Sequence, residues 1–299
     1  MIGFVSTNTW LAALALTASA AAATAQVTGD LRLHTITSRV FGNTRPLRVL
    51  VPSGYDATGN RNRRYPVLFL NDGQNLFDAA TAALNPMEWG VDEVVVRLIR
   101  ERRIQPMIIV GIDSAGRRGR FKEYFPWVDV LLQPPEPNPQ GSRYPEFLVD
   151  EVVPFVKKHY RVSSDVRQVG IGGSSAGALA AIMAVLHRPD VFGRLLAESP
   201  SLYLDDYHIL REPRGNLAAW PGRVFLGVGT NESNAPACDP TASRRGGLAN
   251  DQQRFADALR SWGVAEKAIR LRVVPCAQHD EHAWGLRLPE ALEFLFGGR

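Results

Sequence analysis

The sequence has little of what marks metal-binding, membrane or nucleic-acid-binding proteins. It holds only two cysteines in 299 residues, and two cysteines without nearby histidines at metal-ligand spacing do not predict a zinc site. Beyond the N-terminal region, no apolar stretch approaches the length of a membrane-spanning helix. The net charge of +4 is modest, and the arginine clusters are not interleaved with aromatic residues, so no nucleic-acid groove is predicted. What remains is a globular protein whose hydrophobic content of 45% allows a substantial core.

The N-terminal region is typical of a secretory signal peptide. Residues 1–29 carry no charged side chain, and the apolar run of residues 10–23 ends in Ala23-Thr24-Ala25, which fits a small-residue cleavage site. We expect cleavage near Ala25 and export to the periplasm or the medium, which leaves residues 26–299 as the mature chain. The alternative is an uncleaved N-terminal anchor, because no Lys or Arg precedes the apolar run. In an exported protein the two cysteines, Cys238 and Cys276, are expected to form a disulfide.

Short apolar runs alternate with segments of helical periodicity along the rest of the chain. The runs at residues 65–70, 106–112, 166–171, 223–228 and 269–274 are typical of buried strands. This alternation predicts an α/β protein with one mostly parallel central sheet and helices on both faces. The proline-rich segment of residues 132–143 interrupts the alternation without ending it. We therefore interpret it as an insertion within a single domain of residues 26–299.

A serine stands in a glycine-rich turn between a predicted strand and an alanine-rich helix. Gly173-Ser174-Ser175-Ala176-Gly177 fits the pattern Gly-x-Ser-x-Gly, in which a tight turn lifts one serine hydroxyl above the sheet. Ser175 is the candidate nucleophile, and Ser174 is a rival that fits the pattern less well. A turn that only caps the helix is the structural alternative. A dinucleotide-binding loop is not predicted, because Ser175 occupies the position of its last glycine.

Two further residues supply the base and the acid that a serine nucleophile requires. Glu232 follows the predicted strand 223–228, and His279 follows the predicted strand 269–274. The order serine, acid, histidine is that of the α/β hydrolases, and the carboxyl ends of parallel strands meet at one edge of a sheet. A solvated loop carboxylate is the alternative for Glu232. His282 remains a rival to His279, because spacing alone barely separates the two.

The same reasoning extends to the oxyanion hole and the cysteines. A developing oxyanion needs two N–H donors, and the backbone N–H of Ala176, directly after the nucleophile, is expected to be one of them. The other is expected from the loop after the predicted strand of residues 65–70, where Gly73 and Gln74 are the candidates. Cys238 lies in the loop after Glu232, and Cys276 lies three residues before His279. A disulfide between them would restrict the motion of the acid loop relative to the base loop.

Four segments together resemble the putative-esterase family of α/β hydrolases, which includes esterase D-like enzymes, feruloyl esterase modules and siderophore esterases. Residues 71–78 (N-D-G-Q-N-L-F-D) resemble the family's H-D-G-Q-N-L-F-D, and residues 120–126 are similar to its R-x-x-E-Y-x-P. Residues 172–178 resemble its elbow G-G-S-S-M-G-G, and residues 279–288 resemble H-N-E-x-x-W-x-x-R-L. The likeness extends over roughly residues 47–296.

The resemblance implies an α/β-hydrolase fold, Ser175 as the nucleophile and His279 rather than His282 as the base. It also implies that the acid is Glu232, which stands where the family has aspartate in a G-T-N-D segment. Glutamate keeps the charge and lengthens the arm. Asn71 in place of the family's histidine is a second departure.

The sequence therefore predicts an exported serine esterase that acts through an acyl-enzyme on a small-molecule or glycan-linked ester, without a cofactor, a metal or a nucleic-acid partner. The alternative is an acyltransferase on the same fold, similar to the mycolyl transferases, in which a sugar or lipid hydroxyl replaces water. A binding protein that has lost catalysis is disfavoured, because the order of serine, acid and histidine is intact.

Overall fold

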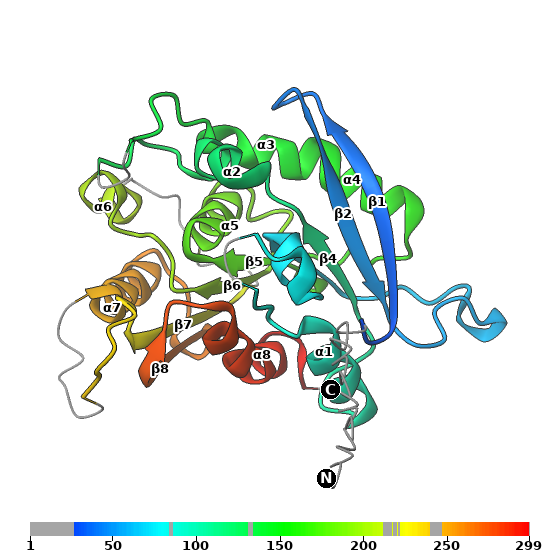
Figure 1. The fold of residues 1–299 in the computed structure, drawn as a ribbon. Helices are drawn as coiled ribbons and strands as arrows, with labels where there is room; N and C mark the ends of the chain where they lie inside the picture. The colour runs from blue at the N-terminus through cyan, green and yellow to red at the C-terminus, as the bar shows by residue number, and fades with distance from the viewer. Residues whose placement is uncertain are drawn as a thin grey trace, which may run out of the picture.

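The computed structural model describes residues 27–83, 86–130, 134–211, 217, 220, 222–239 and 247–298. The predicted signal peptide, residues 1–25, lies outside this part of the chain. The described residues form one eight-stranded sheet with the strand order β1-β2-β4-β3-β5-β6-β7-β8 (Figure 1). The strands are β1 (Asp30–Ser38), β2 (Asn43–Val51), β3 (Val67–Asn71), β4 (Ile108–Ile112), β5 (Val169–Ser174), β6 (Arg194–Glu198), β7 (Arg223–Asn231) and β8 (Ile269–Gln278).

The sheet is mostly parallel, as predicted. Strands β1 and β2 form an antiparallel pair, and β2 is also antiparallel to β4. All the remaining neighbours, from β4 through β3 and β5 to β8, run parallel. Every residue of the central strands β3, β4 and β5 is buried, which is expected where helices cover both faces of a parallel sheet. The carboxyl ends of these parallel strands therefore share one edge of the sheet.

Helices cover both faces, which confirms the predicted layers. Helices α1 and α8 pack on one face, and α3, α4, α5 and α7 pack on the other (Figure 1). The helices are α1 (Val91–Arg100), α2 (Gly116–Tyr124), α3 (Tyr144–Phe147), α4 (Val153–His159), α5 (Ser175–His187), α6 (Leu204–Arg211), α7 (Gly247–Ser261) and α8 (Glu281–Phe296). Among the helices of the described residues, none has both the length and the apolarity needed to cross a bilayer.

Two helical segments differ from the sequence-based expectation. Helix α2, with the sequence G-R-R-G-R-F-K-E-Y, has no apolar periodicity and was not predicted. Buried ion pairs hold it, since Arg120 contacts Asp72 and Glu123 contacts Arg45. The amphipathic pattern of residues 146–160 predicts a single helix, but the structure has α3 and α4 joined by a π-helical turn. Pro154, near the start of α4, has no backbone N–H to continue an α-helical pattern there.

Candidate active site

The predicted elbow is present between β5 and α5. Ser175 is the first residue of α5 and has a φ of 54°, in the left-handed region that few non-glycine residues adopt. A Cβ atom on Gly173 would lie 2.9 Å from the backbone of Gly177, which is closer than real contacts allow, so the turn requires glycine there. Ser174, the rival, is 4% exposed, whereas Ser175 is partly exposed. The elbow thus presents Ser175 rather than Ser174 toward solvent.

Glu232 and His279, which are far apart in the sequence, form a hydrogen bond in the structure. Each residue directly follows a strand: Glu232 comes after β7 and His279 comes after β8. The distance from Glu232 Oε2 to His279 Nδ1 is 2.6 Å. Because an ionised carboxylate can only accept, Nδ1 must be the donor, which leaves Nε2 of the neutral ring free to accept a proton. The Glu232 side chain is 8% exposed and that of His279 is 26% exposed.

The other carboxylate oxygen of Glu232 is held by two donors. Glu232 Oε1 accepts hydrogen bonds from Ser199 Oγ at 2.8 Å and from the backbone N–H of Gly229 at 2.5 Å. Ser199 Oγ in turn lies 3.1 Å from Nε1 of Trp284. The backbone N–H of His279 donates to Oδ1 of Asn234 at 2.7 Å. Both the carboxylate and the histidine are therefore fixed by neighbours that the sequence analysis did not identify.

Ser175 lies at the same edge of the sheet as this pair, because β5, β6, β7 and β8 are neighbours in parallel. The segment after β6 bridges the two parts of the site. The backbone N–H of Ser201 donates to the carbonyl oxygen of Ser175 at 3.3 Å, and Ser199 contacts Glu232. Among the described residues, no hydrogen bond joins the hydroxyl of Ser175 to the ring of His279. The structure therefore joins the acid to the histidine and places the serine at a nearby strand end.

The loop proposed for the oxyanion hole forms a buried 3₁₀ turn directly after β3. It begins after Asp72, whose φ is 58°, and covers Gly73–Asn75. Hydrogen bonds within the turn use the N–H groups of Asn75 and Leu76 and leave out those of Gly73 and Gln74. A Cβ atom on Gly73 would come within 2.6 Å of the backbone of β4, so only glycine fits. The N–H of Ala176 lies in the first turn of α5, where backbone donors have no partner within the helix.

The two cysteines form the predicted disulfide. Cys238 and Cys276 are bonded, with their Cα atoms 5.6 Å apart. The backbone N–H of Cys276 also donates to Oγ1 of Thr230 at 2.8 Å. The bridge therefore links the segment after Glu232 to the end of β8, close to His279.

Asn71, where the sequence departs from the family pattern, connects β3 to the elbow. Its Nδ2 donates to the carbonyl oxygen of Gly177 at 2.7 Å, and its Oδ1 accepts from the hydroxyl of Tyr144 at 2.7 Å. The neighbouring carboxylate of Asp72 accepts two hydrogen bonds of 2.8 Å from Arg120. These contacts fix the end of β3 against the start of α5.

A buried ion pair lies beneath the acid and the histidine. Glu198, the last residue of β6, contacts Arg287 of α8 at 2.7 Å, and both side chains are almost fully buried. Burial raises the pKa of Glu198 to about 7, and the charge of Arg287 opposes this rise. Glu198 directly precedes Ser199, whose hydroxyl donates to Glu232. The Glu198–Arg287 pair therefore fixes the end of β6 next to the acid.

His282, the rival to His279, lies elsewhere. Its side chain is exposed on the first turn of α8 and lines a cavity of about 330 Å³ with Arg272 and Glu290.

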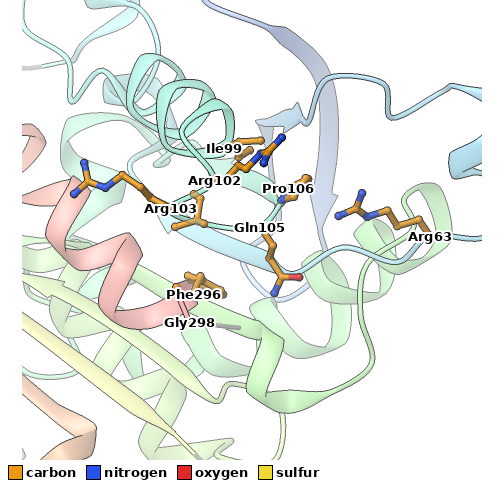
Figure 2. Close-up of a pocket in the computed structure, with 10 residues that line it drawn as sticks. Arg63, Ile99, Arg102, Arg103, Gln105, Pro106, Phe296 and Gly298 are labelled. Atoms are coloured by element: carbon orange, nitrogen blue, oxygen red, sulfur yellow. The ribbon is translucent and has the colours of Figure 1, made fainter.

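A cavity of about 800 Å³ is lined by arginines 63, 102 and 103 and by Phe296, as Figure 2 shows. These residues precede β3 and β4 or end α8, so the cavity lies at the amino-terminal edge of the sheet. None of the candidate catalytic residues lines it.

The strand order, the elbow after β5 and the ends of β7 and β8 that carry an acid and a histidine define an α/β hydrolase. The chain belongs to the family described as "Putative esterase", whose profile matches residues 38–295. Membership in this family supports ester hydrolysis as the class of reaction.

Two curated proteins and one solved structure illustrate the likeness. The uncharacterized protein YbbA of Bacillus subtilis is 23% identical over 262 residues, which cover 86% of this chain and 94% of YbbA. An endo-1,4-beta-xylanase/feruloyl esterase of Xylanibacter ruminicola is 22% identical over 209 residues, 69% of this chain and 25% of that protein. A solved ferulic acid esterase shares the fold with a TM-score of 0.67 and 21% identity, over 90% of this chain and 98% of that one.

Proposed function

We propose that this protein is an exported serine esterase that hydrolyses carboxylic esters through Ser175, His279 and Glu232. The observation that carries the proposal is the 2.6 Å hydrogen bond from His279 Nδ1 to Glu232, at the same sheet edge as the elbow serine. This bond orients the imidazole so that Nε2 is the basic nitrogen. The left-handed backbone of Ser175 supports its role, because strained residues concentrate where a side chain must be presented to a substrate.

The residues fit the two half-reactions of an acyl-enzyme mechanism. Ser175 Oγ attacks the ester carbonyl carbon while its proton passes to Nε2 of His279, and the imidazolium then protonates the departing alcohol. Water repeats the sequence on the acyl-enzyme, releases the carboxylic acid and restores the serine. The charge on the tetrahedral oxygen is stabilised by the N–H of Ala176 and by one of the turn donors, Gly73 or Gln74. Glu232 stabilises the imidazolium in both steps.

The mechanism requires a hydrogen bond between the Ser175 hydroxyl and Nε2 of His279, which we expect to form when the substrate binds. Catalytic hydrogen bonds are often long before the substrate binds and shorten in the complex. His279 is partly exposed, with 26% of its side chain accessible, so a substrate can reach its ring.

The proposed substrates are small-molecule or glycan-linked carboxylic esters. The relatives named feruloyl and ferulic acid esterases support this class. The disulfide supports export, because such bonds persist in oxidising compartments, and N-terminal sequencing of the exported protein would test cleavage near Ala25. An acyltransferase would use the same residues, and product analysis with and without an alcohol acceptor separates the two reactions.

The decisive experiment compares Ser175→Ala with Ser174→Ala on a short-chain nitrophenyl ester. Removal of a triad nucleophile typically lowers kcat by about 10⁴-fold or more. We expect that loss for Ser175→Ala, whereas Ser174→Ala should retain most of the activity. Equal activity of the Ser175→Ala variant and the unmodified protein would remove the proposal.

A further inference from the structure

We propose that Ser199 and Trp284 are positioning residues that hold the carboxylate of Glu232 in the orientation that reaches His279. They would thereby allow the site to use a glutamate where an aspartate is usual. This inference rests on the proposed function. Neither residue is expected to contact the substrate's reacting atoms, since Ser199 is fully buried and Trp284 is 5% exposed. Their effect would be transmitted through the carboxylate of Glu232.

The chemistry of tryptophan fixes the direction of the hydrogen bonds. The indole Nε1–H can only donate, so Ser199 Oγ must accept from Trp284 across 3.1 Å. The single hydroxyl proton of Ser199 is then directed to Glu232 Oε1, 2.8 Å away. Oε1 also receives the backbone N–H of Gly229. With two donors on Oε1, the carboxylate is held with Oε2 toward the histidine.

Trp284 contacts both ends of this chain of residues. Its ring meets the imidazole of His279 edge-on, with the ring centroids 5.1 Å apart and the planes at 84°. The contacts from Trp284 through Ser199 and Glu232 to His279 therefore return to Trp284 and form a closed cycle. A closed cycle restricts the carboxylate and the imidazole together, which independent contacts would not do.

The backbone of Ser199 supports a functional rather than a merely structural reading. Its φ is 45°, in the left-handed region that serine seldom occupies. Its own N–H is held by the carbonyl oxygen of Gly227 at 2.8 Å. Such sparsely populated conformations cluster at active sites, where they aim a side chain that a relaxed backbone would direct elsewhere.

The cycle of contacts explains how the site can use glutamate, which has a longer side chain than aspartate. Glutamate has one more rotatable bond than aspartate, so an unrestrained Glu232 would spend less time in the orientation that reaches His279. The Ser199 hydroxyl and the Gly229 N–H remove that freedom.

The test uses three variants of the full-length protein in its disulfide-bonded form. Trp284→Phe keeps an aromatic ring beside His279 and removes the indole N–H together with the rest of the five-membered ring. Ser199→Ala removes the hydroxyl, and Ser199→Gly removes it while tolerating the positive φ. The control is Ser38→Ala, since Ser38 is also buried and hydrogen-bonded, through its Oγ to the N–H of Phe41, but lies on the far strand β1. Steady-state kinetics with nitrophenyl acetate, the pH profile of kcat/KM and thermal melting are measured for each.

We expect both Ser199 variants to lower kcat by about 10-fold to 100-fold, which corresponds to one hydrogen bond to a charged group. KM should change by less than about twofold, because substrate contacts are untouched. Without the Ser199 hydroxyl, less of the negative charge of Glu232 is offset by hydrogen bonds. The carboxylate then stabilises the imidazolium form of His279 more strongly, so the acidic limb of the kcat/KM profile should move to higher pH. Trp284→Phe should give a smaller change in the same direction, because the Ser199 hydroxyl is then free to rotate.

A structural role alone would lower the melting temperature and leave kcat and the pH profile as in Ser38→Ala. That result would overturn the inference while leaving the proposed triad intact. If Ser199→Ala does not fold, Trp284→Phe decides the matter by the same two readouts. If Ser175→Ala retains activity, the proposed function itself fails, and this outcome is recognised independently of the Ser199 variants.

Discussion

His279 Nδ1 lies 2.6 Å from Glu232 Oε2, although the two residues are 47 positions apart in the sequence. If this contact orients the catalytic base, Glu232→Gln should lower kcat by about 10³-fold to 10⁴-fold, because an amide can present an N–H and favour the wrong imidazole tautomer. Glu232→Asp should also be impaired, because the arm shortens by about 1.5 Å, the length of one C–C bond. Steady-state kinetics at constant pH would check both. Full activity of Glu232→Gln would show that another residue is the acid.

The Cys238–Cys276 disulfide should contribute strongly to stability. The two cysteines are 38 residues apart, and closing a loop of that length in the unfolded chain is associated with about 4 kcal/mol of stabilisation in the chain-entropy model. We expect Cys238→Ser/Cys276→Ser to lower the free energy of unfolding by about 2–4 kcal/mol and to lower kcat by a smaller factor than Glu232→Gln does. Urea unfolding of the oxidised protein, the reduced protein and the double variant would measure this. Identical midpoints would contradict it.

Glu198 should make stability depend on pH. Burial raises its pKa to about 7 from the ordinary value of 4.5, so the folded state binds this proton more tightly than the unfolded state does. Its contribution is therefore fully present below about pH 4.5 and is lost as the pH rises through 7. The difference in free energy of unfolding between the unmodified protein and Glu198→Gln should change across that window, favouring the unmodified protein more at the acidic end. Urea unfolding at several pH values measures it, and parallel curves would exclude this role of Glu198.

The Asp72–Arg120 pair should be essential to the turn beside the elbow. The side chains are 5% and 11% exposed, so Arg120→Met would leave a buried carboxylate without its partner. Breaking such a pair typically costs about 3–5 kcal/mol. Arg117→Met is the matched control, because Arg117 lies one turn earlier on α2, is exposed and makes no ion pair within the described residues. We expect the control to change the free energy of unfolding by less than about 0.5 kcal/mol. Equal effects of the two variants in urea unfolding would contradict the assigned role.

The sequence by itself determined the order of the strands and helices. It also determined where the residues that could act as nucleophile, acid and base lie along the chain. Apolar runs identified the parallel strands, and the carboxyl ends of such strands meet at one edge whatever the strand order is. That is why Ser175, Glu232 and His279 could be placed together before any coordinates. The elbow required small residues by local sterics, and an exported chain with only two cysteines allows one intramolecular pairing. The roles of the three residues stay predictions.

Only the tertiary structure decided which neighbours hold those residues. The sequence of α2 carries no apolar periodicity, and the helix exists because Arg120 and Glu123 find buried partners on other segments. No local pattern marks Ser199, whose importance arises from Glu232 and Trp284, 33 and 85 residues away. Such contacts depend on how strands stack and helices pack, and the same residue types without these partners would be ordinary loop or core positions. The periodicity of a sequence indicates whether a residue is buried or exposed. Which side chain it contacts depends on the tertiary packing.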